Sequence, residues 1–187
     1  MSAYLYRYAS PLGGLTLSGD GEALTGLWFD GQKRFPETYG PDGKPVRLSP
    51  ERCQEGPPSM FAEAQAWLDR YFGGGVPDFT PPLRLYGTPF RKAVWALLLR
   101  VPYGHTVTYG ELAASAAKVL GTARMSARAV GAAVGHNPVS LIVPCHRVVG
   151  AGGKLTGYSA GLEVKARLLA LEGAAIHGIT EETVCEL

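Results

Sequence analysis

A thiol and an imidazole stand next to each other at Cys145 and His146, within the segment SLIVPCHRVVG that covers residues 140–150. The thiolate form of cysteine is a strong nucleophile, and a histidine that another group orients can raise the thiolate fraction at neutral pH. Pro144 fixes its own φ and biases Val143 towards an extended conformation, so we expect Cys145 to be held rigidly in a strand-like segment. The pair therefore predicts nucleophilic chemistry at the sulfur.

The geometry of a strand limits how this pair can cooperate. Neighbouring residues of a strand point to opposite faces, so direct contact between Cys145 Sγ and the imidazole is not guaranteed, and a water molecule could bridge them. An inert buried cysteine beside a core histidine would give the same dipeptide, and the dipeptide alone favours that interpretation. The rest of the sequence has to decide between the two.

Upstream of the cysteine, the sequence predicts two short helices joined by a tight turn. Thr108 and Glu111 have the spacing of a capping box, in which each side chain satisfies a backbone N–H group of the other, so a helix should cover residues 109–119. A glycine follows, and Thr122 or Ser126 can cap a second helix. Two such helices indicate a helix-turn-helix, an arrangement that often binds DNA.

The second of these helices, which should end near Gly135, has two different faces. Val130, Ala133 and Val134 share the face that we expect to pack inward. The opposite face combines arginine with very small residues, namely Arg124, Arg128, Gly131 and Gly135. Such a face would let the backbone approach phosphate groups closely, with Arg128 reaching into a groove. The alternative is that the small residues only permit tight helix packing and the arginines are solvated.

The first part of the chain has a different pattern. Residues 3–29 alternate and turn in the manner of antiparallel strands. Residues 31–58 are rich in proline, glycine and charge, and we expect a long, partly mobile loop there. Residues 59–72 have apolar side chains at three- and four-residue steps, which predicts an amphipathic helix. A further helix should start at Thr88-Pro89.

These elements predict an α+β fold with two domains. Residues 1–80 would form a small N-terminal domain, an antiparallel sheet plus a helix. Residues 86–175 would form a mainly helical C-terminal domain that contains the helix-turn-helix, and residues 176–187 would be a tail.

Composition excludes several classes of protein. The chain has 187 residues, of which 46% are hydrophobic and 18% are charged, as in a globular protein. No apolar run approaches the roughly 20 residues that cross a bilayer, and the N-terminus does not resemble a secretory signal, so we expect a cytoplasmic protein without membrane contact. Three cysteines, Cys53, Cys145 and Cys185, leave at least one unpaired and argue against a disulfide framework.

Charge is unevenly distributed, although the net charge is only +2. Residues 1–83 hold 7 basic and 10 acidic side chains, whereas residues 84–187 hold 11 basic and 6 acidic ones. This positive second half suggests an anionic partner, but an excess of this size also occurs on proteins that bind nothing acidic.

Four motifs that occur in order connect these observations. They are GTPFRKAVWALL (87–98), VPYGHTVTYGELA (101–113), ARAVGAAVGHNPVSLIVPCHRVVG (127–150) and TGYSAGLEVKARLLALEG (156–173). In these motifs the chain resembles the O6-alkylguanine-DNA alkyltransferases, DNA-repair proteins that take an alkyl group from guanine O6 onto a cysteine in a single, irreversible turnover. The resemblance implies that Cys145 is the acceptor thiol.

The resemblance also implies a relay behind this thiol. His146 would act as the base through a water molecule, and Glu172 would hold the other imidazole nitrogen and stabilise the imidazolium. Asn137 would brace the turn between the second helix and the cysteine segment. Without the resemblance, Glu172 would be interpreted as a solvated acid at a helix end and Asn137 as an ordinary turn residue before Pro138.

The DNA side of the implied reaction requires base flipping, because a sulfur cannot reach guanine O6 inside the duplex. Tyr109 would press on the target phosphate and donate to guanine N3, and Arg128 would fill the vacated space in the stack. The remaining residues implied in binding DNA or the flipped base are Val148, Tyr158, Ser159, Arg124, Ala129 and Gly131. Tyr158 could equally be an ordinary core aromatic residue.

The implied partner is double-stranded DNA that contains O6-alkylguanine, and the implied state is a monomer without a cofactor. Some relatives bind zinc in the N-terminal domain, but residues 1–83 contain no histidine and only Cys53, so we expect no metal. Two alternatives remain open. One is a non-catalytic relative that binds alkylated DNA, and the other is a cysteine hydrolase that uses Cys145, His146 and Glu172.

Overall fold

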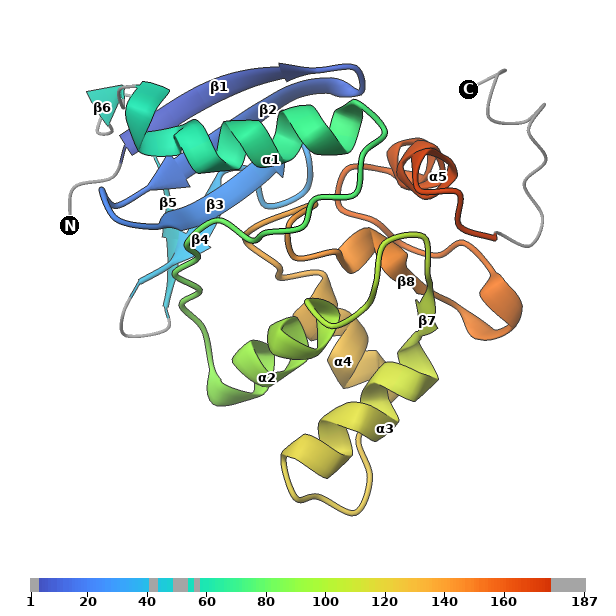
Figure 1. The fold of residues 1–187 in the computed structure, drawn as a ribbon. Helices are drawn as coiled ribbons and strands as arrows, with labels where there is room; N and C mark the ends of the chain where they lie inside the picture. Colours follow the sequence, from blue (N-terminus) through green and yellow to red (C-terminus); the bar gives the residue numbers. More distant parts are fainter. Residues whose placement is uncertain (1–3, 41–43, 49–53, 56–57, 176–187) are drawn as a thin grey trace. The chain divides into compact units, whose positions relative to one another are not determined.

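The computed structural model of the chain describes residues 4–40, 44–48, 54–55 and 58–175. They form two compact units (Figure 1). The first comprises Met1–Gly87 together with Pro138–Ile142, and the second comprises Thr88–Asn137 and Val143–Leu187. The predicted tail, Cys53 and Cys185 lie outside the described residues. The predicted α+β class is confirmed, because a small, mainly antiparallel sheet precedes the helices of the second unit.

The sheet of the first unit has four strands in the order β3-β2-β1-β6. They are β1 (Tyr4–Ser10), β2 (Gly13–Gly19), β3 (Leu24–Phe29) and β6 (Gln54–Glu55). The pairs β1–β2 and β2–β3 are antiparallel, whereas β6 adds to β1 in parallel. The leucines of β2 are fully buried on one face of the sheet, and Thr16 and Ser18 are buried on the other, so this central strand is covered on both faces.

Helix α1 (Ala62–Phe72), preceded by the 3-10 helix η2 (Pro58–Phe61), covers this sheet (Figure 1). The Tyr6 ring stacks on Phe61 with the centroids 5.5 Å apart, and the Tyr8 hydroxyl donates to Asp69 at 2.7 Å. Tyr6 and Tyr8 lie on one face of β1 because strand residues alternate. The helix buries Ala64, Trp67, Leu68 and Tyr71, the face that the sequence periodicity predicts.

Two distant segments pair with the outer edge of β3. The Leu24 N–H donates to the Pro82 carbonyl at 2.8 Å, and the Leu27 N–H donates to the Pro138 carbonyl at 2.9 Å. The Ser140 N–H donates to the Leu27 carbonyl at 2.8 Å. These bonds satisfy an edge that would otherwise be open to pairing, and they explain why Pro138–Ile142 belongs to the first unit.

The prediction that residues 31–58 form one long loop is wrong. Strands β4 (Glu37–Tyr39) and β5 (Pro45–Arg47) pair with each other in antiparallel, and β6 lies in the same stretch. Thr38, in β4, donates its hydroxyl to the Thr25 carbonyl of β3 at 2.8 Å. These strands are short and depend on pairing with distant residues, so the local composition does not indicate them.

In the second unit, three helices pack on one another: α2 (Pro89–Leu98), α3 (Tyr109–Val119) and α4 (Ala127–Val134). Trp95 of α2 is fully buried and donates its indole N–H to the Ala133 carbonyl of α4 at 3.0 Å. The unit also holds β7 (Val107–Thr108) and β8 (Val148–Val149), which pair in parallel, the 3-10 helices η3 (Cys145–Arg147) and η4 (Ala151–Gly153), and α5 (Leu162–Leu171).

Local signals place the starts of these helices correctly. The Thr88 hydroxyl accepts from the Arg91 N–H ahead of α2, and the capping box of Thr108 and Glu111 is present at α3. Of the two candidate caps for α4, Ser126 is the one used. Within the described residues, no helix has both the length and the apolar character needed to cross a bilayer.

A close contact in β3 gives a test of this packing. The ring of Trp28 lies over Gly26, so that a Cβ atom added at Gly26 would be 1.8 Å from Trp28 Cη2. We expect Gly26→Ala to lower the free energy of unfolding by about 1–3 kcal/mol, because the buried ring has to move. Urea unfolding measures the change.

Gly110→Ala is the matched control. A Cβ atom at Gly110, in α3, would meet Thr108 Oγ1 at an ordinary 3.8 Å, and alanine favours a helix over glycine. This variant should be at least as stable as the wild type. Equal stability of Gly26→Ala and the wild type would contradict the packing described for β3.

Candidate active site

Cys145 lies in a tight turn, which corrects the prediction of a strand-like segment. It begins the 3-10 helix η3, and the Arg147 N–H donates to the Pro144 carbonyl at 3.1 Å. Pro144 restricts the chain as predicted, but its ψ of 64° turns the backbone rather than extending it. The rule that neighbours point to opposite faces therefore does not apply to Cys145 and His146. Cys145 has 7% of its surface exposed, and His146 has none.

The Asn137 side chain holds the cysteine from the other side of the turn. Its Nδ2 donates to the Val143 carbonyl at 2.7 Å and to Cys145 Sγ at 3.1 Å. Asn137 lies three residues beyond the last residue of α4, so one amide group links the end of that helix to the cysteine segment. A donor aimed at the sulfur favours the thiolate over the thiol.

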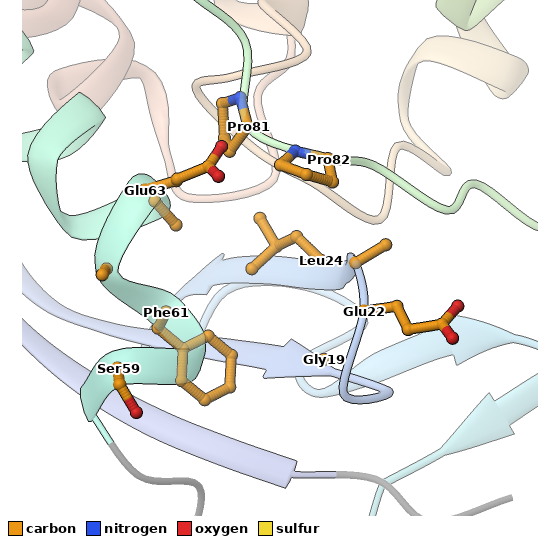
Figure 2. A pocket seen from close by; sticks show the side chains of 11 residues that line it. Gly19, Glu22, Leu24, Ser59, Phe61, Glu63, Pro81 and Pro82 are labelled. Atoms are coloured by element: carbon orange, nitrogen blue, oxygen red, sulfur yellow. The ribbon is translucent and has the colours of Figure 1, made fainter.

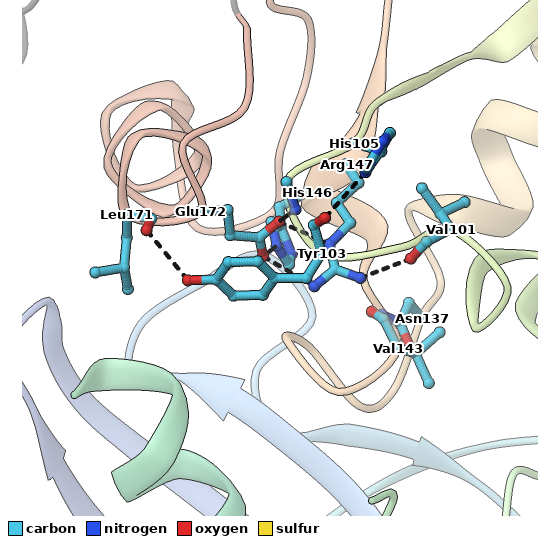
Figure 3. Close-up of polar contacts among 10 residues, drawn as sticks. Val101, Tyr103, His105, Asn137, Val143, His146, Arg147, Leu171 and Glu172 are labelled. Carbon is cyan, nitrogen blue, oxygen red and sulfur yellow. Dashed lines mark hydrogen bonds and ion pairs between the residues drawn. The ribbon is translucent and has the colours of Figure 1, made fainter. Parts of the chain in front are cut away.

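Glu172, the residue after α5, contacts His146 (Figure 3). The two side chains are both fully buried, and 2.7 Å separates Glu172 Oε1 from His146 Nε2. The Gly104 N–H also donates to Glu172 Oε2, at 3.2 Å. The interpretation of Glu172 as a solvated acid is therefore excluded.

Arg147 forms the other half of the Glu172 environment, and the sequence analysis did not identify it (Figure 3). Its Nε donates to Glu172 Oε2 at 2.8 Å and its Nη2 to Oε1 at 3.0 Å, so the contact is bidentate. Its Nη1 donates to the Val101 carbonyl at 2.7 Å, and its guanidinium lies 5.7 Å from the centre of the Tyr103 ring. The only sign in the sequence that Arg147 is buried is its position within a mostly apolar segment.

These contacts determine the ionisation of Glu172. Burial alone would raise the pKa of Glu172, but the hydrogen bonds and charges of His146 and Arg147 outweigh it and lower the pKa to about 2. An ionised carboxylate only accepts hydrogen bonds, so His146 must carry its proton on Nε2. In the neutral imidazole, Nδ1 then holds the lone pair that can take a proton.

Burial acts against the charged forms of both the thiol and the imidazole. Burial raises the pKa of the Cys145 thiol, against the opposing effects of the Asn137 hydrogen bond and the Lys165 charge. Burial also lowers the pKa of His146, although the bond to Glu172 opposes this. A thiol with a raised pKa and a neutral imidazole need a proton transfer before the sulfur can react.

Tyr109 lies close to this pair. Burial raises the pKa of the half-buried Tyr109 phenol, and the charge of a Cys145 thiolate raises it further. A Cβ atom at Gly131 would lie 3.5 Å from the Tyr109 ring, so α3 and α4 approach closely here. Tyr109, Cys145 and His146, three of the predicted site residues, thus lie in one neighbourhood.

Of the residues predicted to contact DNA, three lie on α4 and one lies before it. Arg128 is exposed on α4, and Ala129 and Gly131 are half-buried on the same helix. Arg124 is exposed as well, but it precedes the Ser126 cap and does not belong to the helix face on which it was predicted. The correction follows from the choice of Ser126 rather than Thr122 as the cap.

The residues predicted to surround the guanine have different exposures. Val148 is fully buried in β8, whereas Tyr158 and Ser159 are half-buried in the segment before α5. The Tyr158 and His146 rings meet edge to face with their centroids 6.5 Å apart. Tyr158 is therefore next to the relay.

A separate pocket in the first unit contains no comparable chemistry (Figure 2). Phe61, Leu24 and two prolines line it together with Glu22 and Glu63, and its lining holds neither cysteine nor histidine. Glu22 also accepts from Arg84 at 2.7 Å. Among the described residues, no group of three or more His, Cys, Asp or Glu side chains is arranged to hold a metal ion.

Comparison with known proteins places both halves of the chain. Residues 4–85 match the profile of the 6-O-methylguanine DNA methyltransferase, ribonuclease-like domain, and residues 89–174 match that of the DNA binding domain of the same protein family. The methylated-DNA–protein-cysteine methyltransferase of Mycobacterium bovis is 44% identical over 163 residues, which cover 87% of this chain and 88% of the relative. For that of Methanosarcina acetivorans the identity is 42% over 171 residues, 91% of this chain and 99% of the relative.

Solved structures agree with these relatives. The crystal structure of Mycobacterium tuberculosis OGT in complex with DNA matches with a TM-score of 0.74 and 40% identity, covering 92% of this chain and 93% of that chain. The Mycobacterium tuberculosis O6-methylguanine methyltransferase matches with a TM-score of 0.73 and 42% identity, covering 91% and 93%. Because the two profiles together span most of the chain and the identity reaches 44%, this protein belongs to the 6-O-methylguanine DNA methyltransferase family.

Proposed function

We propose that this protein repairs DNA by transferring an alkyl group from O6-alkylguanine in a duplex to Cys145, once per molecule. The observation that carries the proposal is a pair of contacts in a chain of this family: the Asn137 amide donates to Cys145 Sγ, and the next residue, His146, is hydrogen-bonded to Glu172. The activity named for the relatives requires a cysteine acceptor, and among the cysteines that the structure describes, Cys145 has a base and a carboxylate beside it.

The first step is removal of the thiol proton. His146 takes it at Nδ1, directly or through a water molecule, and becomes an imidazolium. Glu172 stabilises that cation through Nε2–H at 2.7 Å, and the Asn137 amide donates to the sulfur as it becomes negative. Arg147 keeps Glu172 ionised and fixed in position, so it acts through Glu172 rather than on the substrate.

The second step is displacement at the alkyl carbon. The Cys145 thiolate attacks this carbon in line, the new S–C bond forms, and the C–O6 bond breaks with its electron pair on the guanine. The Tyr109 hydroxyl donates a hydrogen bond to guanine N3 and stabilises the negative charge of the leaving group, and the proton that His146 took from the thiol balances that charge. The thioether that remains is a poor leaving group, and the proposed set of residues contains no second nucleophile to remove it. The reaction therefore stops after one turnover.

DNA recognition is assigned to the helix-turn-helix of α3 and α4. Arg128 is exposed on α4, where Gly131 and Ala129 add little bulk, so the helix can come close to the DNA backbone. Arg128 would occupy the space that the flipped guanine leaves. Arg124, on the connection before α4, would contact phosphate. Val148, Tyr158 and Ser159 would surround the flipped base.

The two alternatives predict different behaviour. A non-catalytic relative would bind alkylated DNA without accepting the alkyl group. In such a protein, Cys145 and the side chains beside it would have no chemical role. A cysteine hydrolase would turn over many times. Nothing in the site geometry or the relatives favours either of them, and the stoichiometry of transfer separates all three.

Other properties remain predictions that accompany this function. We propose that residues 86–175 are the DNA-binding and alkyl-transfer domain and residues 1–80 a separate domain, a division that the matched ranges 89–174 and 4–85 support. The monomeric state, the cytoplasmic location and the absence of a cofactor or metal also stay predictions.

The stoichiometry of transfer is the first test. Incubation with a duplex carrying labelled O6-methylguanine should transfer one equivalent of label per protein, and peptide mapping should find it on Cys145. Cys145→Ala should abolish transfer and leave DNA binding largely intact, whereas Cys53→Ala and Cys185→Ala should transfer normally. Transfer well beyond one equivalent would exclude the mechanism, and stoichiometric transfer in Cys145→Ala would place the acceptor elsewhere.

A second test concerns the relay. Glu172→Gln should slow transfer by a factor on the order of ten to a thousand, because an amide cannot stabilise the imidazolium as a carboxylate does. Duplex binding should change little. Single-turnover rates across neutral pH measure the effect.

Glu163→Gln is the control for this variant. It removes a carboxylate from the same helix, α5, but Glu163 is exposed and pairs with Arg167 at 3.1 Å. Since Glu172→Gln also removes the partner of the buried Arg147, thermal unfolding has to be measured alongside the rates. An unaltered rate in a folded Glu172→Gln protein would show that Glu172 is only structural.

A third test separates DNA handling from chemistry. Arg128→Ala should slow transfer from duplex DNA far more than transfer from free O6-methylguanine, because a free base needs no flipping. Duplex affinity should also become less dependent on salt if Arg128 contacts the backbone. Arg7→Ala, which removes an exposed positive charge from β1, is the charge-matched control. Equal losses on both substrates would mean that Arg128 supports the fold or the pocket instead.

A further inference from the structure

Lys165 is a charged side chain that the proposed mechanism has not used. It lies in α5 with none of its surface exposed. Its Nζ donates to the carbonyl oxygen of Val148 at 2.5 Å and to that of Thr156 at 2.7 Å. Its sequence position favours burial too, because Leu168 and Leu169, three and four residues later, are also fully buried.

Burial of this ammonium group is costly. Desolvation lowers the pKa of Lys165 to about 8, although the charge of a Cys145 thiolate opposes that shift. A methionine or leucine would fill the same volume without this cost. The ammonium group must therefore contribute something that an apolar side chain would not.

The two carbonyl groups belong to the segment that follows Cys145 and to the segment that carries Tyr158, whose ring contacts that of His146. Val148 follows η3 directly and begins β8, which pairs with β7, the strand before Tyr109. Thr156 precedes Tyr158 and Ser159. One ammonium group thus ties α5 to both segments assigned to the guanine. A carbonyl oxygen can accept two hydrogen bonds, so Val148 can still accept from a bound base.

Lys165 also changes the electrostatics of the sulfur. Burial raises the pKa of the Cys145 thiol, and the charge of Lys165 opposes this by lowering it. Burial lowers the pKa of His146, and the charge of Lys165 lowers it further. The other titratable groups near the sulfur are His146 of η3 and Tyr109 of α3, and Arg147 and Glu172 form a neutral pair behind His146. Lys165 therefore adds net positive charge where the thiolate forms.

We propose that Lys165 is a positioning residue for alkyl transfer, whose ammonium group holds the Val148 and Thr156 carbonyls in place and favours the Cys145 thiolate by its charge. The relevance to DNA rests on the proposed function. The effect on the sulfur does not, because it can be measured without DNA.

The decisive experiment is the pH profile of Cys145 alkylation by iodoacetamide, followed on the Cys145 peptide by mass spectrometry. In Lys165→Met, the apparent pKa of Cys145 should rise by about one unit and the rate at neutral pH should fall about tenfold. Single-turnover transfer from an O6-methylguanine duplex should slow by roughly ten- to a hundredfold, because the carbonyl groups lose a charged donor. Duplex binding should be retained.

Lys154→Met is the matched control, since Lys154 is exposed on the neighbouring turn and the substitution removes the same charge. It should leave the pH profile unchanged. An unchanged apparent pKa in a folded Lys165→Met protein would overturn the proposal and leave Lys165 as packing only. Circular dichroism and thermal unfolding establish whether the variant is folded.

If Lys165→Met does not fold, Lys165→Gln decides, because its amide can still donate to a carbonyl but carries no charge. A raised apparent pKa supports the proposal, and a wild-type profile overturns it. The two proposals fail differently. A wild-type protein that takes no methyl group from DNA would refute alkyl transfer, while the iodoacetamide profile would still report on Lys165 and the thiol.

Discussion

An ionised carboxylate, buried at Glu172, sets the conditions for the rest of the site. Its side chain has no exposed surface, so every charge that it carries must be compensated by protein groups. Arg147 supplies two hydrogen bonds, His146 one and the Gly104 backbone another. These four contacts come from two segments far from Glu172 in sequence. Their shared dependence on one carboxylate makes the orientation of His146 a consequence of folding rather than of substrate binding.

The same carboxylate fixes the position of the proton on the buried imidazole of His146. An acceptor next to Nε2 determines the tautomer and leaves on Nδ1 the lone pair that the proposed mechanism uses as the base. Burial raises the pKa of the thiol and so acts against the thiolate. The Asn137 amide and the Lys165 charge oppose that effect only in part.

Backbone geometry around the sulfur is held by side chains rather than by long secondary structure. Asn137 binds the Val143 carbonyl, and Lys165 binds those of Val148 and Thr156. Between Asn137 and Val143, the chain passes through the first unit, where Ser140 pairs with Leu27 of β3. A site made of short turns needs such polar contacts because η3 and β8 are too short to be stable alone.

Local signals in the sequence were enough for the helices and for the chemical residue types. Thr88, Thr108 and Ser126 cap α2, α3 and α4 through hydrogen bonds within three residues, and the apolar periods identify the buried faces, so both can be deduced from short windows. The cysteine, histidine and glutamate of the relay followed from the family motifs. Only the tertiary structure decided the rest: the tight turn at Cys145, strands β4 to β6, the pairing of Pro138–Ile142 with β3, and the burial of Arg147 and Lys165. Each of these features depends on partners that are distant in sequence. For Arg147 and Lys165, the neighbouring residues do not indicate that buried groups will compensate the charge.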